Sequence, residues 1–498
     1  MRIIFPKSFY NFITLIGVAI AVISIGIVLF VMLLEATSAN PHPYSGIIAF
    51  VIAPAFLVIG LLLVPLGIMR EHRRERLGKP HGLHLPMIDM NNPHHRTMLV
   101  TFVVSTILFL SILGFTSYKA YDYTESVQFC GETCHSVMSP EYTAYQYSPH
   151  ARVSCVECHI GSGASYFVRS KLSGSYQVYA TVFNAYPRPI PTPIENLRPA
   201  QQTCEQCHWP RQFYSEKLHT NTYYLSDEQN TKWTLNLLVK IGGGNSEAGP
   251  TAGIHWHMNI NNEVTYAATD RERQNIPWVR SKKPDGTVTI YRDTEANISD
   301  DSLKHLFTRR MDCIDCHNRP THIYHPPSTS VNNVMALGWI DPQIPSVKSI
   351  AVKALETPYS TKHDALDSIS LMIHAFYKQN YPPVDQSRPA GIDSAVEQVQ
   401  RIYGRNYFPE MGVSWKKFPD NIGHLYSKGC FRCHDGKHKN DKGEILSRDC
   451  NTCHVILAQK FERDTLRMSL GGIAYRHPVD IGDAWKEMNC SDCHNSNQ

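Results

Sequence analysis

Seven short motifs, each a pair of cysteines followed directly by a histidine, account for all 14 cysteines of the chain. This is the attachment pattern of c-type haem, in which two thiols form thioethers with the porphyrin and the adjacent imidazole binds the iron. The sequence therefore predicts seven covalently bound haems. The motifs are Cys130/Cys134-His135, Cys155/Cys158-His159, Cys204/Cys207-His208, Cys313/Cys316-His317, Cys430/Cys433-His434, Cys450/Cys453-His454 and Cys490/Cys493-His494.

Two other uses of paired cysteines explain the motifs less well. Zinc sites combine cysteine and histidine, but nothing in them requires a histidine directly after the second cysteine of every pair. Disulfides would not link each pair to a histidine either. The first motif has one extra residue between its cysteines, and Gly131 gives that longer loop the freedom to bulge.

Three long apolar runs without a charged residue lie within residues 1–120: Phe12–Leu34, Ile47–Met69 and Met98–Tyr118. Each run is long enough to cross a bilayer as a helix. The first is longer than the apolar part of a cleaved signal peptide, lacks a small-residue cleavage site and leads into two further runs. We therefore predict a retained membrane anchor with three transmembrane helices.

The distribution of basic residues predicts the orientation of this anchor. The segment 70–79, after the second run, contains five Lys and Arg residues, whereas the segment 35–46 contains none. Basic loops stay in the cytoplasm, so the third helix delivers all seven motifs to the other side of the membrane. Haem attachment outside the cytoplasmic membrane of bacteria agrees with this placement. The basic segment is too short to indicate nucleic-acid binding.

The residues after the anchor predict a haem-packed region that is mainly helical and irregular, because porphyrins supply much of its apolar core. Alternating apolar residues at 220–225, 263–267 and 287–291 indicate strands, and apolar spacing over 345–405 indicates helices. We predict a module with the first three motifs at 121–209, a β-rich insertion at 210–310, the fourth motif at 311–325, a helical connector at 326–418 and a lobe with the last three motifs at 419–498.

Histidines outside the motifs are candidates for the second ligand of each iron. Twelve remain outside the motifs and the anchor. A histidine only a few residues from a motif cannot easily fold over its own porphyrin, so it is expected to reach a neighbouring haem. The alternative for each is a structural or exposed histidine. The candidates by this argument are His150, His322, His424 and His438, and His477 is a further candidate for the last three motifs. His255, His257 and His374 are left open between the two roles, and Met138 is a candidate ligand of the first haem.

A family resemblance follows from two segments behind the anchor. They read Cys130-Gly-Glu-Thr-Cys134-His135-Ser-Val-Met138 and Ser148-Pro-His150-Ala-Arg-Val-Ser-Cys155-Val-Glu-Cys158-His159. Together with the fourth motif and His322, they resemble the NapC/NirT family of membrane-anchored quinol dehydrogenases, over roughly residues 120–210 and 311–325. The complete arrangement resembles the larger inner-membrane relatives with seven haems, although this chain has three spans where the family has one.

The resemblance implies that the chain takes electrons from menaquinol at the membrane and passes them to a periplasmic cytochrome or reductase. It implies His322 as the ligand of the third haem and His150 as that of the fourth. The family's first haem often has a methionine two residues after the motif histidine; here Met138 is three residues after it. The family also has a lysine near the quinol, and Lys171 is the nearest match. A solvated lysine is the alternative.

Three functions remain open at this stage. The first is a quinol-oxidising electron conduit, with the electron exit at the last three haems. The second is a terminal reductase of a small oxyanion, for which His255, Trp256 and His257 are the best candidate patch. The third is a haem-bearing subunit that docks to another respiratory enzyme. The sequence leaves open whether the chain forms a homo-oligomer.

Overall fold

The computed structural model describes residues 11–37, 53–78, 89–133, 135–161, 164–194, 197–209, 215–242, 253–258, 262–296, 298–461 and 464–494. The chain divides into two compact units, which are described separately. One comprises Met1–Ser126 with Ile160–Gln177, and the other comprises Val127–His159 with Val178–Gln498.

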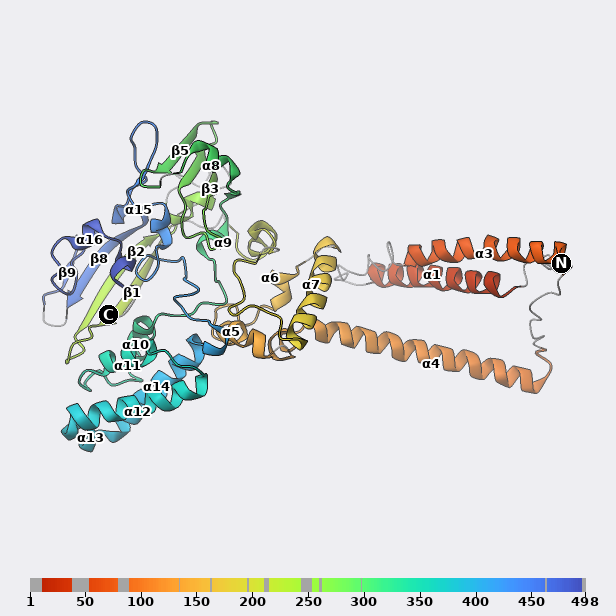
Figure 1. Cartoon of the computed structure of the whole chain (residues 1–498), viewed down its shortest axis with the longest axis horizontal. Helices are drawn as coiled ribbons and strands as arrows, with labels where there is room; N and C mark the ends of the chain where they lie inside the picture. The colour runs from red at the N-terminus through yellow and green to blue at the C-terminus, as the bar shows by residue number, and fades with distance from the viewer. Residues whose placement is uncertain are drawn as a thin grey trace. The chain divides into compact units, whose positions relative to one another are not determined.

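Three helices of the first unit are long and apolar enough to cross a membrane: α1 (Phe12–Thr37), α3 (Ala53–Arg76) and α4 (Pro93–Thr124) (Figure 1). They confirm the three predicted spans, although residues 47–52 of the second predicted run lie outside the described part. None of the residues of α4 is buried within the chain. A helix that is apolar and exposed all round is suited to lipid, not to water.

Helices α1 and α3 pack side by side through glycines. A Cβ atom added to Gly17 would lie 2.8 Å from the carbonyl oxygen of Gly60, and one added to Gly60 would lie 2.8 Å from that of Gly17. Small residues at the contact let two membrane helices approach closely. The resulting van der Waals packing holds them together, because the hydrophobic effect does not drive helices together in lipid.

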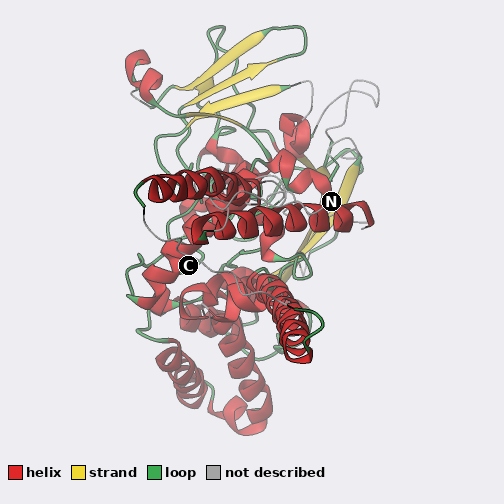
Figure 2. Cartoon of the chain, turned by 90° about the vertical axis from the view of Figure 1, so that its right-hand side faces the viewer, coloured by secondary structure: helices red, strands yellow, loops and turns green. Residues whose placement is uncertain are grey.

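The second unit contains two antiparallel sheets, whose strands are yellow in Figure 2. The first has the strand order β1-β2-β8-β9 and the second has the order β6-β3-β4-β5-β7. All the strands predicted from alternating residues are present. The strands are β1 (Glu216–Tyr224), β2 (Lys232–Lys240), β3 (Glu263–Ala267), β4 (Trp278–Lys282), β5 (Val288–Asp293), β6 (Thr308–Arg310), β7 (His438–Lys439), β8 (His454–Phe461) and β9 (Arg467–Met468).

Both sheets join the predicted insertion to the predicted C-terminal lobe, which differs from the separate domains expected from the sequence. Strand β8 pairs with β2, with Trp233 opposite Phe461, and β7 pairs with β5, with Arg292 opposite Lys439. These pairings connect residues that are far apart in the chain, so the local alternation of apolar residues could not reveal them.

The predicted helical connector forms a bundle with a core of its own. Its helices are α10 (Pro327–Ala336), α11 (Val347–Glu356), α12 (Lys362–Asn380), α13 (Pro382–Ser387) and α14 (Pro389–Asn406). Their apolar faces meet in one cluster, which includes Val331, Leu355, Ile369, Ile373, Ile392 and Val399. Ordinary side-chain packing therefore stabilises this part of the molecule.

Short helical segments carry most of the motifs and the residues around them. They are η3 (Phe129–Thr133), α5 (His135–Gln146), α6 (Cys155–His159), η4 (Ala200–Gln202), η5 (Cys204–Gln206), η7 (Ile254–Met258), α8 (Asp300–His305), α9 (Cys313–Cys316), η8 (Pro409–Met411), η9 (Gly429–Arg432), α15 (Cys450–Cys453), α16 (Ala484–Glu487) and α17 (Cys490–His494). The longer helix α7 (Ala164–Val182) follows the second motif.

Candidate haem-binding sites

A single helical turn sets the geometry of the Cys-x-x-Cys-His motifs. In the third, fourth and fifth motifs, the amide of the histidine donates to the carbonyl of the first cysteine, over 2.8 Å in His208 and His317 and 3.0 Å in His434. Residues three and four positions apart lie on the same side of such a turn. Both thiols and the imidazole of a motif can therefore address the same porphyrin.

The first motif begins in a wider turn. Residues Phe129–Thr133 form a π-helix, which accommodates the extra residue between the cysteines. A Cβ atom on Gly131 would lie 2.3 Å from the ring of Tyr142, so glycine is required for this close approach. Cys134 and the side chain of His135 lie outside the described part of the chain. The half-buried Met138 in α5 stays a candidate ligand.

Six motif histidines each have a second histidine ring nearby. A bond from an imidazole nitrogen to a first-row metal is about 2 Å long, so two imidazoles on opposite sides of one metal ion have ring centres about 6 Å apart. The observed separations are 6.4 Å for His159 and His322, 6.0 Å for His208 and His150, 6.4 Å for His317 and His255, 5.9 Å for His434 and His257, 6.2 Å for His454 and His424, and 6.3 Å for His494 and His477.

Four of the predicted second ligands lie opposite a motif histidine. His150, His322 and His424 each face the histidine of a motif other than the nearest one in the chain, and His477 faces His494. The pairing differs from that implied by the family resemblance. With the motifs numbered in chain order, His322 faces the histidine of the second motif and His150 faces the histidine of the third. Which motif each histidine faces depends on contacts between distant segments of the chain. Matching the sequence to the family's motifs residue by residue does not show those contacts.

His255 and His257 were left open by the sequence, yet both face motif histidines. They lie in η7 with Trp256 between them, and their rings face His317 and His434 respectively. The spacing His-Trp-His is the sequence feature that could have indicated two ligands of different haems, because two histidines one residue apart on a tight turn point in different directions.

His438 does not face a motif histidine. Its side chain is only 1% exposed, and both of its ring nitrogens make hydrogen bonds. Nδ1 lies 2.9 Å from the carboxylate of Asp435 and Nε2 lies 2.7 Å from the carbonyl oxygen of Ile276. Burial opposes its charge, but the Asp435 carboxylate and the Ile276 carbonyl raise the pKa of His438 above its usual value. A histidine held in this way has no nitrogen left for iron, and the prediction of a ligand here does not fit the structure.

Backbone carbonyls orient five of the six facing histidines. The Nδ1 atoms of His150, His255, His257, His322 and His477 lie 2.7–3.3 Å from the carbonyl oxygens of Pro320, Ile241, Ile254, Glu141 and Val479. A carbonyl can only accept, so in His150, His255, His257 and His322 the Nδ1 atom carries the proton and Nε2 holds the lone pair. Nδ1 of His477 also lies 3.3 Å from the amide nitrogen of Val479, which donates. Metal-binding histidines characteristically have such a partner on their second nitrogen.

Burial also keeps several of these imidazoles uncharged. Desolvation lowers the pKa of His257, His322 and His424 to about 4. At neutral pH these rings are therefore neutral, which is the form that binds a metal ion.

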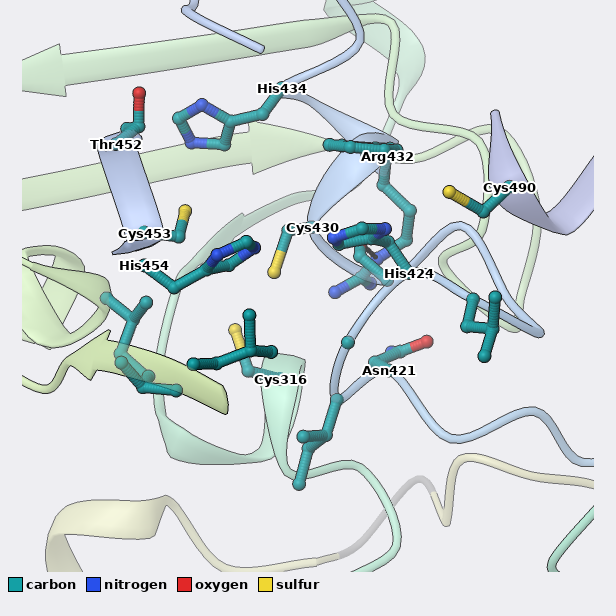
Figure 3. Close-up of a pocket in the computed structure, with 18 of the residues that line it drawn as sticks. Cys316, Asn421, His424, Cys430, Arg432, His434, Thr452, Cys453, His454 and Cys490 are labelled. Carbon is teal, nitrogen blue, oxygen red and sulfur yellow. Dashed lines mark hydrogen bonds between the residues drawn. The ribbon is translucent and has the colours of Figure 1, made fainter. Parts of the chain in front are cut away.

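Five of the six facing histidines, all except His322, line one large cavity of about 2320 Å³ in the second unit, together with cysteines of the last six motifs. Ordinary small-molecule sites have volumes of about 300–1,000 Å³, so this cavity suits several large groups. Figure 3 shows His424, His434 and His454 on its wall with Cys430 and Cys453. In the described chain, His424 and His454 also each have a buried Nδ1 without a hydrogen-bond partner.

The same residues do not form zinc sites or disulfides. No group of three or more His, Cys, Asp and Glu side chains with metal-binding geometry occurs among the described residues, whereas structural zinc needs four ligands. None of the 13 described cysteines forms a disulfide. Facing histidine pairs beside free cysteines therefore fit haem, which would be held by the cysteines of each motif and by one imidazole on either side.

Cysteines of consecutive motifs are neighbours. Cys130 lies beside Cys155, and Cys204 lies beside Cys313. Burial raises the pKa of Cys158, and the nearby Cys204 raises it further. Burial likewise raises the pKa of Cys316 and Cys453 to about 11, with Cys430 as a contributing neighbour of both. Burial also raises the pKa of Cys490, to which Cys450 contributes. The motifs therefore follow one another in space in the order of the chain.

Residues inside the fourth and fifth motifs tie the two together. The buried carboxylate of Asp315 accepts hydrogen bonds from Tyr266 at 2.6 Å, Arg309 at 3.0 Å and Arg273 at 3.1 Å. Arg432, within the fifth motif, donates to the backbone carbonyl of Asp315 at 2.6 Å. Charge-assisted hydrogen bonds of this kind hold the two turns at a fixed separation.

Lys171 belongs to the first unit. Its Nζ atom lies 2.9 Å from a carboxylate oxygen of Glu125, directly after the end of α4, and 5.7 Å from the ring centre of Tyr121. The Glu125 side chain is only 15% exposed. The predicted quinol lysine is thus one half of an ion pair next to the third membrane span.

These features define a membrane-anchored multihaem c-type cytochrome. Residues 92–189 match the N-terminal region of the NapC/NirT cytochrome c family. The cytochrome c-type protein ImcH of Geobacter sulfurreducens is 45% identical over 489 residues, which cover 97% of this chain and 95% of that protein. The cytochrome c-type protein NrfH of Wolinella succinogenes is 31% identical over 113 residues, which cover 22% of this chain and 62% of NrfH. No solved structure matches the chain.

The chain belongs to the NapC/NirT family of c-type cytochromes. It is therefore an electron-transport protein of the inner membrane with covalently bound haem c in a periplasmic domain, as the resemblance implied.

Proposed function

We propose that the chain is a quinol dehydrogenase, which passes electrons from menaquinol through seven c-type haems to a periplasmic acceptor. The observation that carries this proposal is the set of six facing histidine pairs, with ring centres 5.9–6.4 Å apart, in a protein with three membrane-spanning helices. Haem held by two histidines supplies one-electron transfer and leaves no open iron face for a substrate.

The spatial order of the motifs supports a single path for electrons. Cys130 follows the last residue of α4 after a few residues, and each later motif adjoins the one before it. A lipid-soluble quinol can donate electrons only near the membrane, so the first motif is the proposed place where electrons enter. The motif of His494 is the proposed place where they leave for a cytochrome or reductase.

Lys171 and Glu125 are the proposed proton-handling pair. Oxidation of a quinol releases protons together with electrons, and a side chain at the site must bind the quinol oxygen or accept its proton. The ion pair lies where α4 ends, which is the level at which a quinol headgroup arrives. Lys171 would donate a hydrogen bond to the quinol oxygen while Glu125 accepts a proton.

The terminal-reductase alternative has less support. It requires an open iron beside polar catalytic groups, and its best candidate patch was His255, Trp256 and His257. Both of these histidines face motif histidines and accordingly suit two-histidine coordination.

The proposal is tested with the full-length, haem-loaded protein in proteoliposomes. A menaquinol analogue should reduce its haems, and the reduced protein should then reduce an added periplasmic c-type cytochrome. Reduction of nitrite by the isolated protein at a comparable rate would support the reductase alternative instead. Failure of quinol to reduce any haem would leave a docking subunit as the better explanation.

A further inference from the structure

Helix α7 has a row of large apolar side chains that the chain leaves exposed. Val168, Leu172 and Tyr176 follow one another at four-residue spacing and are 49%, 68% and 64% exposed. Tyr179 and Val182 continue the row toward the end of the helix and are also exposed. At 3.6 residues per turn, these five residues share an arc of about 120°. Such an arc normally faces a protein core, but here it is exposed.

Basic residues border this apolar row on both sides. Arg169 and Lys171 lie at its two edges by the same helical spacing, and the 19 residues of α7 include no Asp or Glu. Lysine and arginine can lay their aliphatic stems along an apolar surface while their charged ends reach a polar layer. An apolar arc with basic edges and tyrosines matches a lipid surface whose headgroups carry phosphate.

The location of α7 indicates which face of the membrane its apolar row contacts. Its residues up to Gln177 belong to the same compact unit as the membrane-spanning helices. Lys171 forms an ion pair with Glu125, which follows the last residue of α4. Figure 1 shows α7 beside that end of α4. Because α4 leaves the bilayer there, the surface next to α7 is the periplasmic face of the membrane.

We propose that α7 is an interfacial helix. It lies along the periplasmic surface of the inner membrane, with Val168, Leu172 and Tyr176 in the lipid and with Arg169 at the phosphate layer. The bilayer is the occupant, because the apolar row is continuous with an established membrane span and its basic edges complement anionic headgroups. The inference rests on the anchor and not on quinol oxidation, so either proposal can fail while the other holds.

Photo-crosslinking in vesicles tests the proposal. The full-length haem-loaded protein is reconstituted in vesicles of phosphatidylethanolamine and phosphatidylglycerol, with benzoylphenylalanine in place of Leu172. The matched control has it in place of Gln177, an exposed residue of the same helix about 140° away around its axis. A third protein has it in place of Phe109, on the lipid-facing surface of α4, to show that the reaction works.

We expect mass spectrometry to find phospholipid attached at position 172 and at position 109, and none at position 177. Lipid attached at 109 but not at 172 would overturn the proposal. So would equal attachment at 172 and 177, or attachment of position 172 to a protein segment in place of lipid. The substituted positions are exposed, so the haem content should stay at the wild-type value in all three proteins.

Discussion

Histidines that are close in sequence have very different environments in this protein. His257 faces His434 with the two ring planes at 86°, whereas His255 faces His317 with the planes at 6°. His438, only four residues after His434, donates to Asp435 and Ile276 and faces no motif histidine. The role of each imidazole therefore depends on its surroundings in the folded chain and not on its distance from a motif along the sequence.

Replacement of His257 tests this assignment. His257→Ala should leave the iron of the fifth motif with five ligands, so one additional high-spin ferric signal should appear in the electron paramagnetic resonance spectrum. One strongly anisotropic low-spin signal, typical of perpendicular rings, should disappear. The matched control is His438→Gln, which should retain the low-spin spectrum. A high-spin signal in the control and none in His257→Ala would reverse the two assignments.

Lys171 can be tested by removing its charge. Lys171→Gln should slow haem reduction by a menaquinol analogue by about a hundredfold, because the loss of one positioned hydrogen-bond donor to the reacting oxygen typically has that effect. The rate is measured by stopped-flow absorbance. Lys217→Gln, which changes an exposed lysine of β1, serves as the control and should react at the wild-type rate. An unchanged rate in Lys171→Gln would remove this residue from the proposed quinol site.

At the scale of elements, the turns that carry the fourth and fifth motifs are joined by buried polar contacts. Arg432 donates to the carbonyls of Asp315, Arg273 and Gly429. Arg432→Gln should leave some of these acceptors unsatisfied and lower the free energy of unfolding by about 2–3 kcal/mol. Thermal unfolding followed by circular dichroism measures the change.

The exposed ion pair of Arg476 with Asp464 supplies the control for Arg432. Arg476→Gln should change the free energy of unfolding by less than about 1 kcal/mol, because exposed pairs contribute little. Equal destabilisation by the two variants would show that Arg432 has no special part in holding the turns together.

At the scale of the whole molecule, the shared sheets limit how the electron exit can be tested. Truncation after Asp420 would remove β7, β8 and β9, and would uncover the edges of β2 and β5. We expect such a protein to be insoluble or poor in haem, because unpaired sheet edges promote aggregation. Soluble, haem-loaded protein at wild-type yield would instead show that the two regions fold independently.

A smaller change keeps the sheets intact. Replacing Cys490 and Cys493 by serine should remove only the haem of the last motif, which follows the last described strand, β9. Reduction of the remaining haems by quinol should continue, while electron delivery to a periplasmic cytochrome should slow markedly. Delivery at the wild-type rate would place the exit at an earlier motif.

Mass spectrometry of the denatured wild-type protein should show seven haem additions, and that of the variant six.

Features that depend on neighbouring residues were predictable from the sequence. The motifs, the three apolar spans and the alternation in β3 each reflect chemistry within a few residues. The facing of His257 with His434 and the pairing of β2 with β8 depend on contacts between distant segments, which one sequence does not encode in any local pattern. His438 was predicted as a ligand because spacing alone does not show the hydrogen bonds of its two ring nitrogens.

The joining of distant segments in both sheets also bears on how the protein is assembled. The periplasmic part of the chain crosses the membrane in chain order after α4, so β2 and β5 reach the periplasm before their partners β8 and β7. Until those partners arrive, the first four motifs stay accessible to the machinery that attaches haem. The late strands therefore close the molecule only after its earlier motifs have been exposed for modification, and β8 begins at His454, a residue of the sixth motif itself.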